Sequence, residues 1–358
     1  MGKIILENKE YTFDQIKNGQ WNEDDSYLHQ AFLFCKQWLN GVEEFELKTS
    51  GSTGKPKKIF VNRLQMEISA EATKAYLKID SESTLLCCLN TDMIAGKMMF
   101  VRAMEWNANL VFVKPKENPL EELWIESRID FAAMVPLQVQ ACLSDEVTIK
   151  KLKNIGLLII GGAPSSTSLK DKIVEEHINA YQTFGMTETV SHIALAPITK
   201  DELVFETLRG VSIGTDEDGR LWISAAMASE EKLQTNDIVV LLNKSQFKWV
   251  GRSDFTINSG GIKIQPEILE PQLSPFILNH FGEISFFVFG KKDEKLGQRL
   301  LLILEGELIE ASKIKSFRND LRANLINYLV PKEVFVFDKF VRTESGKINR
   351  LETIKLLL

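Results

Sequence analysis

Short, almost wholly apolar segments that alternate with helical patterns are the feature of this sequence that most restricts its fold. Four of these segments are typical of buried strands: TLLCCL (84–89), NLVFV (109–113), FAAMV (131–135) and IGLLII (155–160). A strand that is apolar on both faces must be covered on both sides, so the alternation predicts an α/β fold with a mostly parallel sheet between helices. Cys87 and Cys88 are adjacent in the first segment and should be buried on opposite faces of that sheet.

The chain before residue 80 adds a helix and a further strand to this pattern. Apolar residues at helical spacing predict a helix over residues 27–40, and KIFV (58–61) is typical of a strand. Asn62 follows this strand directly and could cap the helix that begins there.

The pattern changes at about residue 200 and again after Gly251. Between 200 and 250, short strand-like runs separated by turn residues, among them 216–219, predict antiparallel β structure. After Gly251, helical and strand-like runs alternate over about a hundred residues, which is enough for a small α+β domain. We therefore expect a large domain over residues 1–251 and a small domain over residues 252–358.

Composition and charge argue against several classes of protein. The 43 basic and 49 acidic residues give a net charge of −6, so no basic excess indicates nucleic acid as a partner. Four cysteines without CxxC spacing argue against a disulfide framework and a zinc site. No apolar run approaches the roughly 20 residues of a membrane span. Charges within MGKIILENKE argue against a signal peptide, and we expect a cytoplasmic protein.

A loop rich in glycine and hydroxyl residues, TSGSTGKPKK at 49–58, is the first segment that carries chemistry. Its backbone N–H groups and hydroxyls can bind phosphate oxygens, because glycine permits the close approach that such contacts need. The residues concerned are Thr49, Ser50, Gly51, Ser52, Thr53, Gly54 and Lys55. The loop is not a Walker A loop, since only two residues separate its glycines and Pro56 follows the lysine. The alternative is a flexible surface loop.

Two further segments lie where strands of the expected sheet end. LLIIGGAP (157–164) runs from a buried strand into a glycine pair, and ligands of open α/β sheets bind beyond the carboxyl ends of strands. YQTFGMTET (181–189) ends a short strand and supplies an aromatic ring, Phe184, followed by Thr187 and Glu188. The hydroxyl could contact phosphate and the carboxylate could bind Mg²⁺. The alternatives are an ordinary strand–helix junction and a solvated surface charge.

The last third of the chain contains two more segments of this kind. WVGRSDFTINSGGIKIQPEILE (249–270) places Arg252 and Asp254 in a turn before a Gly-Gly pair. RTESGKINR (342–350) places Lys347 directly after a glycine near the C-terminus. Taken alone, this lysine would be interpreted as exposed.

In this order and at this spacing, the five segments resemble the motifs of the adenylate-forming superfamily, which comprises acyl-CoA synthetases, adenylation domains and luciferase-like enzymes. The resemblance spans residues 49 to 350. It implies an enzyme that activates a carboxylate with ATP to acyl-AMP and pyrophosphate and passes the acyl group to CoA, with Mg²⁺ bound. It also implies a large N-terminal domain and a small, mobile C-terminal domain.

The resemblance implies a role for each matching residue. The loop at 49–57 would cover the β and γ phosphates. The remaining ATP or AMP contacts would be Gly162, Ala163, Pro164, Phe184, Gly185, Met186, Asp237 and Arg252. Among them, Phe184 would stack near the adenine and Asp237 would bind the ribose hydroxyls. Asn236 precedes that aspartate where the family usually has glycine, a departure that bears on the local turn.

The resemblance also implies which residues take part in the reaction. Thr187 would contact the α-phosphate and Glu188 would hold Mg²⁺. Asp254 would be the hinge between the domains, and Gly260 and Gly261 would meet the pantetheine arm of CoA. Lys347 would stabilise the negative charge that develops when a carboxylate attacks the α-phosphorus. A lysine on a separate mobile domain can be present for this step and absent from the next.

The chain is short, and the segment IAGKMMFVRAMEWNANLVFVKPKENPL (94–120), with SHIAL at 191–195, resembles the o-succinylbenzoate–CoA ligases of menaquinone biosynthesis. Their substrate has two carboxylates, of which one reacts and the other needs a polar or charged partner where it is buried. Candidates for these acyl contacts are Lys97, Arg102, Ser191 and His192. The alternatives are salt bridges on a helix flank for the two basic residues and a hydrogen-bonded pocket wall for the histidine.

Three other functions fit part of the pattern. Another small aryl- or acyl-CoA ligase would share the first half-reaction. An amino-acid-activating domain is less expected, because no carrier segment follows Leu358 in this sequence. A non-catalytic adenylate-binding protein would not need Glu188, Asp237, Arg252 and Lys347 together.

Overall fold

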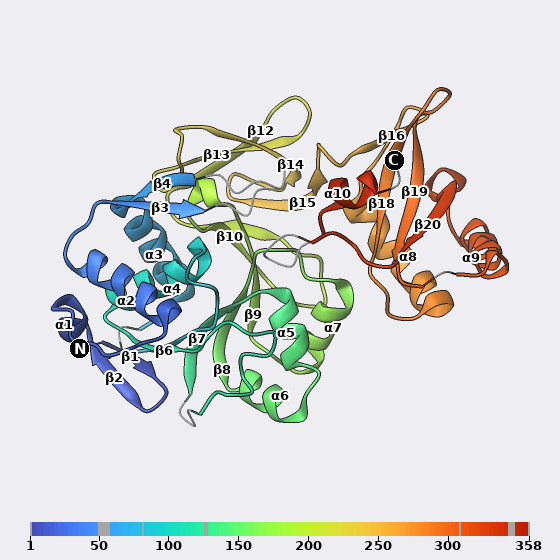
Figure 1. Ribbon diagram of the computed structural model, residues 1–358. Coiled ribbons are helices and arrows are strands. Elements are labelled where there is room, and N and C mark those ends of the chain that lie inside the picture. Colours follow the sequence, from blue (N-terminus) through green and yellow to red (C-terminus); the bar gives the residue numbers. More distant parts are fainter. Residues whose placement is uncertain are drawn as a thin grey trace.

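The molecule consists of a large α/β part and a smaller C-terminal part that lie side by side (Figure 1). The computed structural model describes residues 2–48, 58–80, 82–124, 128–307, 309–342 and 348–356. Two hydrophobic cores are built from residues between Ile4 and Phe247, and two others from residues between Ile257 and Ile354. This separation of the cores supports our proposal of a domain boundary near residue 251.

Among the described residues, thirteen strands form one sheet in the order β12-β13-β14-β15-β11-β10-β9-β8-β7-β5-β6-β1-β2. The parallel part consists of β1 (Lys3–Leu6), β6 (Asn109–Phe112), β5 (Thr84–Cys87), β7 (Ile129–Met134), β8 (Ile155–Ile160) and β9 (Ala180–Gly185). The antiparallel strands are β2 (Lys9–Thr12), β10 (His192–Pro197), β11 (Phe205–Thr207), β12 (Val211–Thr215), β13 (Arg220–Ala225), β14 (Leu233–Leu241) and β15 (Gln246–Arg252). The predicted parallel and antiparallel segments are confirmed, and both belong to one sheet.

Helices cover both faces of the parallel strands, as the apolar segments predict. One core contains buried residues of α1 (Phe13–Lys17), α2 (Ser26–Leu39), α3 (Arg63–Leu77) and α4 (Ile94–Trp106). The opposite core contains buried residues of α5 (Pro136–Cys142), α6 (Glu146–Lys153) and α7 (Thr167–Glu175). Asn62 caps α3 as predicted. Its side chain accepts from the Gln65 N–H, and the Gln65 side chain accepts from the Asn62 N–H.

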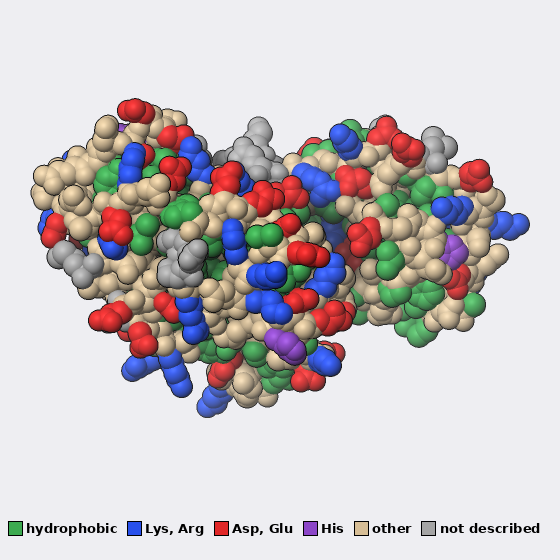
Figure 2. Space-filling model, turned by 90° about the horizontal axis from the view of Figure 1, so that it is seen from below, with side chains coloured by type: hydrophobic (Ala, Val, Ile, Leu, Met, Phe, Trp, Pro, Cys, Tyr) green, Lys and Arg blue, Asp and Glu red, His purple; other side chains and the backbone are tan. Residues whose placement is uncertain are grey.

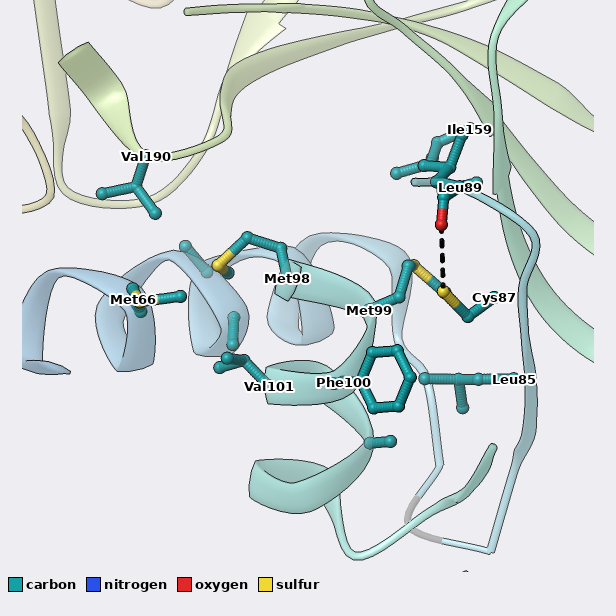
Figure 3. Close-up of a cluster of buried hydrophobic side chains, with 14 of the residues drawn as sticks. Met66, Leu85, Cys87, Leu89, Met98, Met99, Phe100, Val101, Ile159 and Val190 are labelled. Atoms are coloured by element: carbon teal, nitrogen blue, oxygen red, sulfur yellow. Dashed lines mark hydrogen bonds between the residues drawn. The ribbon is translucent and has the colours of Figure 1, made fainter. Parts of the chain in front are cut away.

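The two adjacent cysteines show that β5 is buried on both faces. Cys87 lies in the core beneath α4 with Leu85 and Met99, and its sulfur contacts the Leu89 carbonyl (Figure 3). Cys88 lies in the core on the other face of the sheet. The predicted division of the two thiols between opposite faces is therefore confirmed.

One predicted strand forms but does not join the large sheet. β4 (Lys58–Asn62) pairs antiparallel with β3 (Glu44–Lys48) in a separate two-stranded sheet. Val61 of β4 is buried, whereas Phe60 is 61% exposed, so the strand has one apolar face against the core and one face toward solvent. An apolar run of three residues, 59–61, did not reveal that only alternate side chains are buried.

The smaller part is an α+β unit, as its alternating pattern predicts. Its sheet contains β16 (Ile257–Ser259), β17 (Ile262–Ile264), β18 (Phe286–Asp293), β19 (Gly297–Glu305) and β20 (Glu333–Phe337). Its helices are α8 (Pro266–Phe281), α9 (Ala311–Asn324) and α10 (Arg350–Lys355). Leu273 of α8 and Phe317 of α9 are fully buried in one core with Leu302 of the sheet. Two short 3-10 helices, η1 (Thr187–Thr189) and η2 (Asn327–Leu329), complete the chain's regular elements as described.

Basic and acidic side chains are interspersed over both parts of the molecule on the face shown in Figure 2. This mixture agrees with a sequence that has no basic excess. Of the helices in the described ranges, none combines the length and the apolar character that crossing a lipid bilayer requires.

The burial of the thiols leads to a first prediction. All four cysteines are free and buried, and burial raises the pKa of Cys87 to about 12 and the pKa of Cys142 to about 11. Because the thiolate is the reactive form, we expect a colorimetric thiol reagent to modify none of them in the folded protein and all four in guanidinium. Rapid modification of one thiol per chain under native conditions would show that the described packing is wrong.

Candidate active site

The carboxyl ends of β8 and β9 bring two of the predicted segments together. These strands are parallel neighbours, so the glycine-rich turn at 161–164 and the end of β9 lie at the same edge of the sheet. Gln182 of β9, which is buried, joins them: its amide oxygen accepts from the Ser165 N–H at 3.0 Å. Its amide nitrogen donates to the carbonyls of Ile160 and Ala163, both at 3.1 Å. No sequence pattern could have predicted this role, because a glutamine inside a strand has no recognisable signature.

Two glycines at this edge are required by the backbone. Gly162 has φ of +83°, a conformation that residues with a Cβ rarely adopt. Gly185 lies against the start of β10, where an added Cβ would come within 2.4 Å of the Ser191 carbonyl oxygen. Both positions belong to the predicted nucleotide contacts, and their glycines let the chain turn and pack closely there.

The chain reverses sharply between Thr187 and His192. Val190 has φ of +65° and ψ of −54°, and the Ser191 N–H donates to the Thr189 carbonyl at 2.6 Å, which closes a three-residue turn. A β-branched residue in such a conformation costs about 1–3 kcal/mol. The surrounding contacts must offset this strain to hold the turn, which leaves the Glu188 side chain exposed. One exposed carboxylate fits Mg²⁺, which typically takes one or two carboxylates together with phosphate and water oxygens.

Phe184 is less available than the sequence suggested. Its ring is half-buried and meets Phe247 and Phe205 edge to face, with centroid distances of 5.1 and 5.7 Å. This aromatic cluster fixes the end of β9 and leaves only part of the ring for a ligand.

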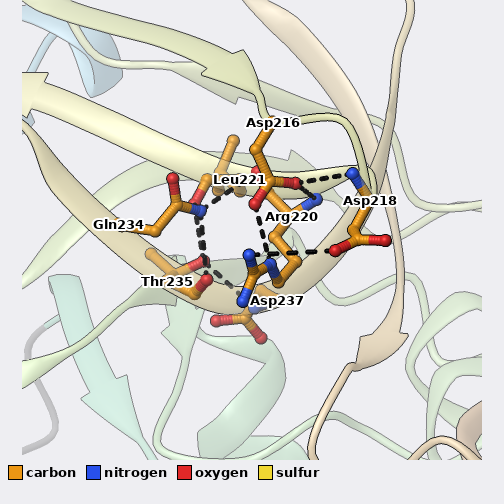
Figure 4. Close-up of polar contacts among 7 residues, drawn as sticks. All are labelled: Asp216, Asp218, Arg220, Leu221, Gln234, Thr235 and Asp237. Carbon is orange, nitrogen blue, oxygen red and sulfur yellow. Dashed lines mark hydrogen bonds and ion pairs between the residues drawn. The ribbon is translucent and has the colours of Figure 1, made fainter.

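Asp237 is buried on β14 and is held by a residue that the motif analysis did not single out. The Trp249 indole N–H donates to its Oδ1 at 2.8 Å. The Asp237 N–H donates to the Thr235 hydroxyl, which donates to the Leu221 carbonyl (Figure 4). Burial raises the pKa of Asp237, and the hydrogen bond from the indole partly offsets that effect. Asn236 has no positive φ, so the strand continues without the glycine that is usual in the family.

Arg252 connects Asp237 to the predicted hinge residue. It lies opposite Asp237 in the pairing of β14 with β15, and the closest atoms, Nη1 and Oδ2, are 3.9 Å apart. Its guanidinium also donates twice to the exposed Asp254, at 2.9 and 2.8 Å. These hydrogen bonds to Asp254 raise the pKa of Arg252, so it is a permanent cation between two carboxylates.

A half-buried glutamate, Glu267, lies where the large part meets the small part. A Cβ added to Gly251, at the end of β15, would come within 2.6 Å of Oε2 of Glu267, which is in the first turn of α8. This oxygen is buried and accepts no hydrogen bond from a described residue. Burial raises the pKa of Glu267 above its ordinary value. One turn further along the helix, Glu270 forms an ion pair with Arg350 at 2.8 Å.

Arg102 of α4 is the most unusual charge in the large part. It is 2% exposed, and no carboxylate of a described residue forms an ion pair with it. One guanidinium nitrogen donates to the Ser191 hydroxyl at 3.0 Å, another lies 3.5 Å from the Met99 sulfur, and Nε has no partner within the described ranges. Burial lowers the pKa of Arg102 to about 10. The alternative of a salt bridge on a helix flank is therefore wrong for this residue.

The other acyl-site candidates differ in their surroundings. His192 is 4% exposed, and burial together with Arg102 holds its pKa well below 6.5, so the ring is neutral. Its nitrogens contact Thr73 at 3.1 Å and Ser191 at 3.4 Å. The Lys97 ammonium donates to the Thr91 carbonyl at 2.7 Å and lies 5.3 Å from the centre of the Phe34 ring.

The other predicted residues lie outside the described ranges or in the small part. The loop at 49–57 and Lys347 lie outside the described residues, so their predicted roles stay predictions. Gly260 and Gly261 form the exposed turn between β16 and β17 in the small part, with φ of +64° and +82°. Within the described ranges, no three His, Cys, Asp or Glu side chains gather as a metal-binding group.

Comparison with known proteins identifies this fold. The model of the AMP-binding enzyme family matches residues 48–214. An acyl-CoA synthetase (AMP-forming)/AMP-acid ligase II-like protein from Dyadobacter fermentans is 35% identical, with 96% of this chain and 97% of that chain covered and a TM-score of 0.64. The fold is that of the adenylate-forming enzymes. The chain belongs to the AMP-binding enzyme family, the adenylate-forming CoA ligases.

More distant relatives carry a narrower name. A 2-succinylbenzoate–CoA ligase from Bacillus cytotoxicus is 24% identical over 97% of this chain and 75% of its own length. The O-succinylbenzoate coenzyme A synthetase from Bacillus subtilis, solved with ATP and magnesium, is 20% identical over 86% of this chain and 69% of its own, with a TM-score of 0.71. At this identity the second likeness shows the fold alone.

The buried carboxylate at the junction leads to a second prediction, Glu267→Gln. Because the folded pKa is raised above the ordinary 4.5, the folded state binds more protons than the unfolded state just above that pH, and stability falls as pH rises through the raised pKa. We expect the variant to be more stable than the parent at neutral pH, with the gain lost as pH falls toward about 4.

Urea unfolding across this pH range measures the effect, and Glu283→Gln at an exposed position is the matched control. A gain that grew as pH fell, or one shared by the control, would contradict the assignment of a destabilising buried charge.

Proposed function

We propose that this chain is an AMP-forming acid–thiol ligase whose carboxylate substrate is o-succinylbenzoate and whose acyl acceptor is CoA. The observation that carries the choice of substrate is Arg102, a buried cation without an acidic partner among the described residues. It donates to Ser191, four residues after Thr187 and at the end of the sharp turn.

Burying an isolated cation costs several kcal/mol, and a ligand anion would offset that cost. The acyl group must lie next to the α-phosphate, because its carboxylate attacks there. Thr187 is the proposed α-phosphate contact, so Arg102 lies on the acyl side of the turn. A substrate with a second carboxylate would present to Arg102 the charge that the protein lacks. Two of the relatives described above are named as ligases of this dicarboxylate, which supports the same choice.

In the first half-reaction, a carboxylate oxygen of the substrate attacks the α-phosphorus of ATP, and the bond to pyrophosphate breaks. The turn at 161–164 and Phe184 would hold the adenine, and Asp237 would accept hydrogen bonds from the ribose hydroxyls. Glu188 would hold Mg²⁺, which supplies positive charge to the phosphates when it is bound. The loop at 49–57 and Lys347 would stabilise the remaining negative charge.

In the second half-reaction, the CoA sulfur attacks the acyl carbon, AMP leaves, and the thiol proton is released. The small part would pivot near Asp254, beyond the proposed boundary at residue 251, and remove Lys347 from the site. Gly260 and Gly261 form an exposed turn without side chains, which suits contact with the narrow pantetheine arm.

Two rival functions predict different results. Another small aryl- or acyl-CoA ligase would release pyrophosphate with monocarboxylates as readily as with o-succinylbenzoate. A non-catalytic adenylate-binding protein would show no exchange between ATP and labelled pyrophosphate with any acid.

A third prediction concerns Lys347, the residue proposed for the first step only. We expect Lys347→Ala to lower acyl-AMP formation by about 10²–10³-fold or more, because one stabilising cation is lost from the transition state. Thioester formation from supplied acyl-AMP should change little. Separate assays of pyrophosphate release and of CoA consumption measure the two steps. Equal loss in both would refute the alternation of domains.

A fourth prediction concerns Arg102 and uses analogues that each keep one carboxylate of the substrate, 4-oxo-4-phenylbutanoate and 2-butanoylbenzoate. We expect the parent protein to prefer the dicarboxylate by kcat/KM, and Arg102→Met to lose this preference by about 10²-fold, as when a buried charge loses its partner. Because the variant removes a buried cation that no described carboxylate neutralises, its free energy of unfolding should be no lower than that of the parent.

Lys97→Met, one turn earlier on α4, is the matched control and should keep the preference. If Lys97→Met lost the preference and Arg102→Met kept it, the anion site would be assigned to the wrong residue. If the parent showed no preference, the proposed substrate would be wrong.

A further inference from the structure

Four side chains from separate elements form one connected chain beneath the turn at Val190. Arg102 of α4 donates to Ser191, which contacts Nδ1 of His192 at 3.4 Å. Nε2 of the same ring lies 3.1 Å from the Thr73 hydroxyl of α3, and that hydroxyl donates to the Ser69 carbonyl at 2.9 Å. Thr73 is fully buried and lies outside every motif in the sequence.

The contact between Thr73 and the Ser69 carbonyl gives this chain a direction. When the Thr73 hydroxyl donates its one proton to that carbonyl, its oxygen accepts from the ring of His192. Nε2 therefore carries the ring proton, and Nδ1 of the neutral ring is an acceptor. The Ser191 hydroxyl donates to Nδ1 and keeps its lone pairs for the Arg102 guanidinium.

The direction of the chain matters for Arg102. A guanidinium only donates, so Ser191 can hold it only while the serine proton points elsewhere. Nδ1 of His192 accepts that proton, and Thr73 fixes the tautomer that makes Nδ1 an acceptor. Without Thr73 the ring could take the other tautomer, and the Ser191 proton would compete with the guanidinium.

We infer that His192 and Thr73 are positioning residues, which fix the orientation of Ser191 and thereby hold Arg102 for the second carboxylate of the substrate. This inference rests on the proposed function. It reassigns His192 from a direct acyl contact to a residue that supports the anion site. It also makes Thr73, on the neighbouring helix α3, a residue that contributes to substrate specificity without contacting the substrate.

The test measures preference rather than activity. The ratio of kcat/KM for o-succinylbenzoate to kcat/KM for each monocarboxylate does not depend on the fraction of folded enzyme. We expect Thr73→Val and Thr73→Ala to lower this ratio about tenfold, the effect of one hydrogen bond, mainly through KM for the dicarboxylate. Thr73→Ser keeps the hydroxyl and should stay within about twofold of the parent, as should KM for ATP in all three variants.

We call the hydrogen-bond chain from Thr73 through His192 and Ser191 to Arg102 the relay. A double-mutant cycle separates this relay from a general loss of packing. In an Arg102→Met background, Thr73→Val should lower the ratio no further, because both changes act on one contact. A ratio that Thr73→Val leaves unchanged, while Arg102→Met abolishes the preference, would overturn the relay and leave the proposed function standing. If Arg102→Met itself left the preference intact, the anion site and the relay would both be refuted.

Discussion

The interpretation of this site depends on a buried guanidinium whose neighbours among the described residues are all neutral. Arg102 contacts a serine hydroxyl and a methionine sulfur, and its charge lies 5.9 Å from the centre of the Phe131 ring. Each of these groups interacts favourably with the guanidinium, but none carries the negative charge that would neutralise it. A carboxylate in their place would have made the ion pair internal to the fold and left nothing for a ligand. The charge is therefore kept at a cost in stability, which is typical of binding sites rather than of cores.

The same turn connects the charge to the nucleotide edge of the sheet. β9 is the last parallel strand, and β10 returns antiparallel beside it after the strained residue Val190. Because the reversal takes so few residues, Glu188 is exposed while His192, four residues later, is buried in the core. A longer, relaxed loop would separate these two groups. The tight turn at Val190 thus keeps the proposed phosphate contacts close to the proposed acyl contacts.

Local patterns predicted much of this fold, and long-range contacts account for most of what they missed. The Asn62 cap and the opposite faces of Cys87 and Cys88 follow from neighbouring residues and were predicted correctly. β4 was assigned to the wrong sheet, since a run of three apolar residues does not show which side chains are buried. Thr73 lies 119 residues from His192 in the sequence, so no local pattern could reveal their contact. Gln182 and Trp249 were missed for the same reason: their roles depend on which elements pack against them.

Arg252 connects the proposed ribose contact directly to the proposed hinge, through electrostatic contacts of a single side chain. Its guanidinium lies between Asp237 and Asp254, and Glu267 of the small part adds a third carboxylate to its surroundings. A ribose bound at Asp237 would occupy Oδ2, the oxygen nearest Arg252, and displace water from around it. The ion pair between Arg252 and Asp254 would then be less screened and stronger, because displacing water lowers the local dielectric. Occupancy of the nucleotide site would in this way stiffen the junction electrostatically, before any contact between the two parts changes.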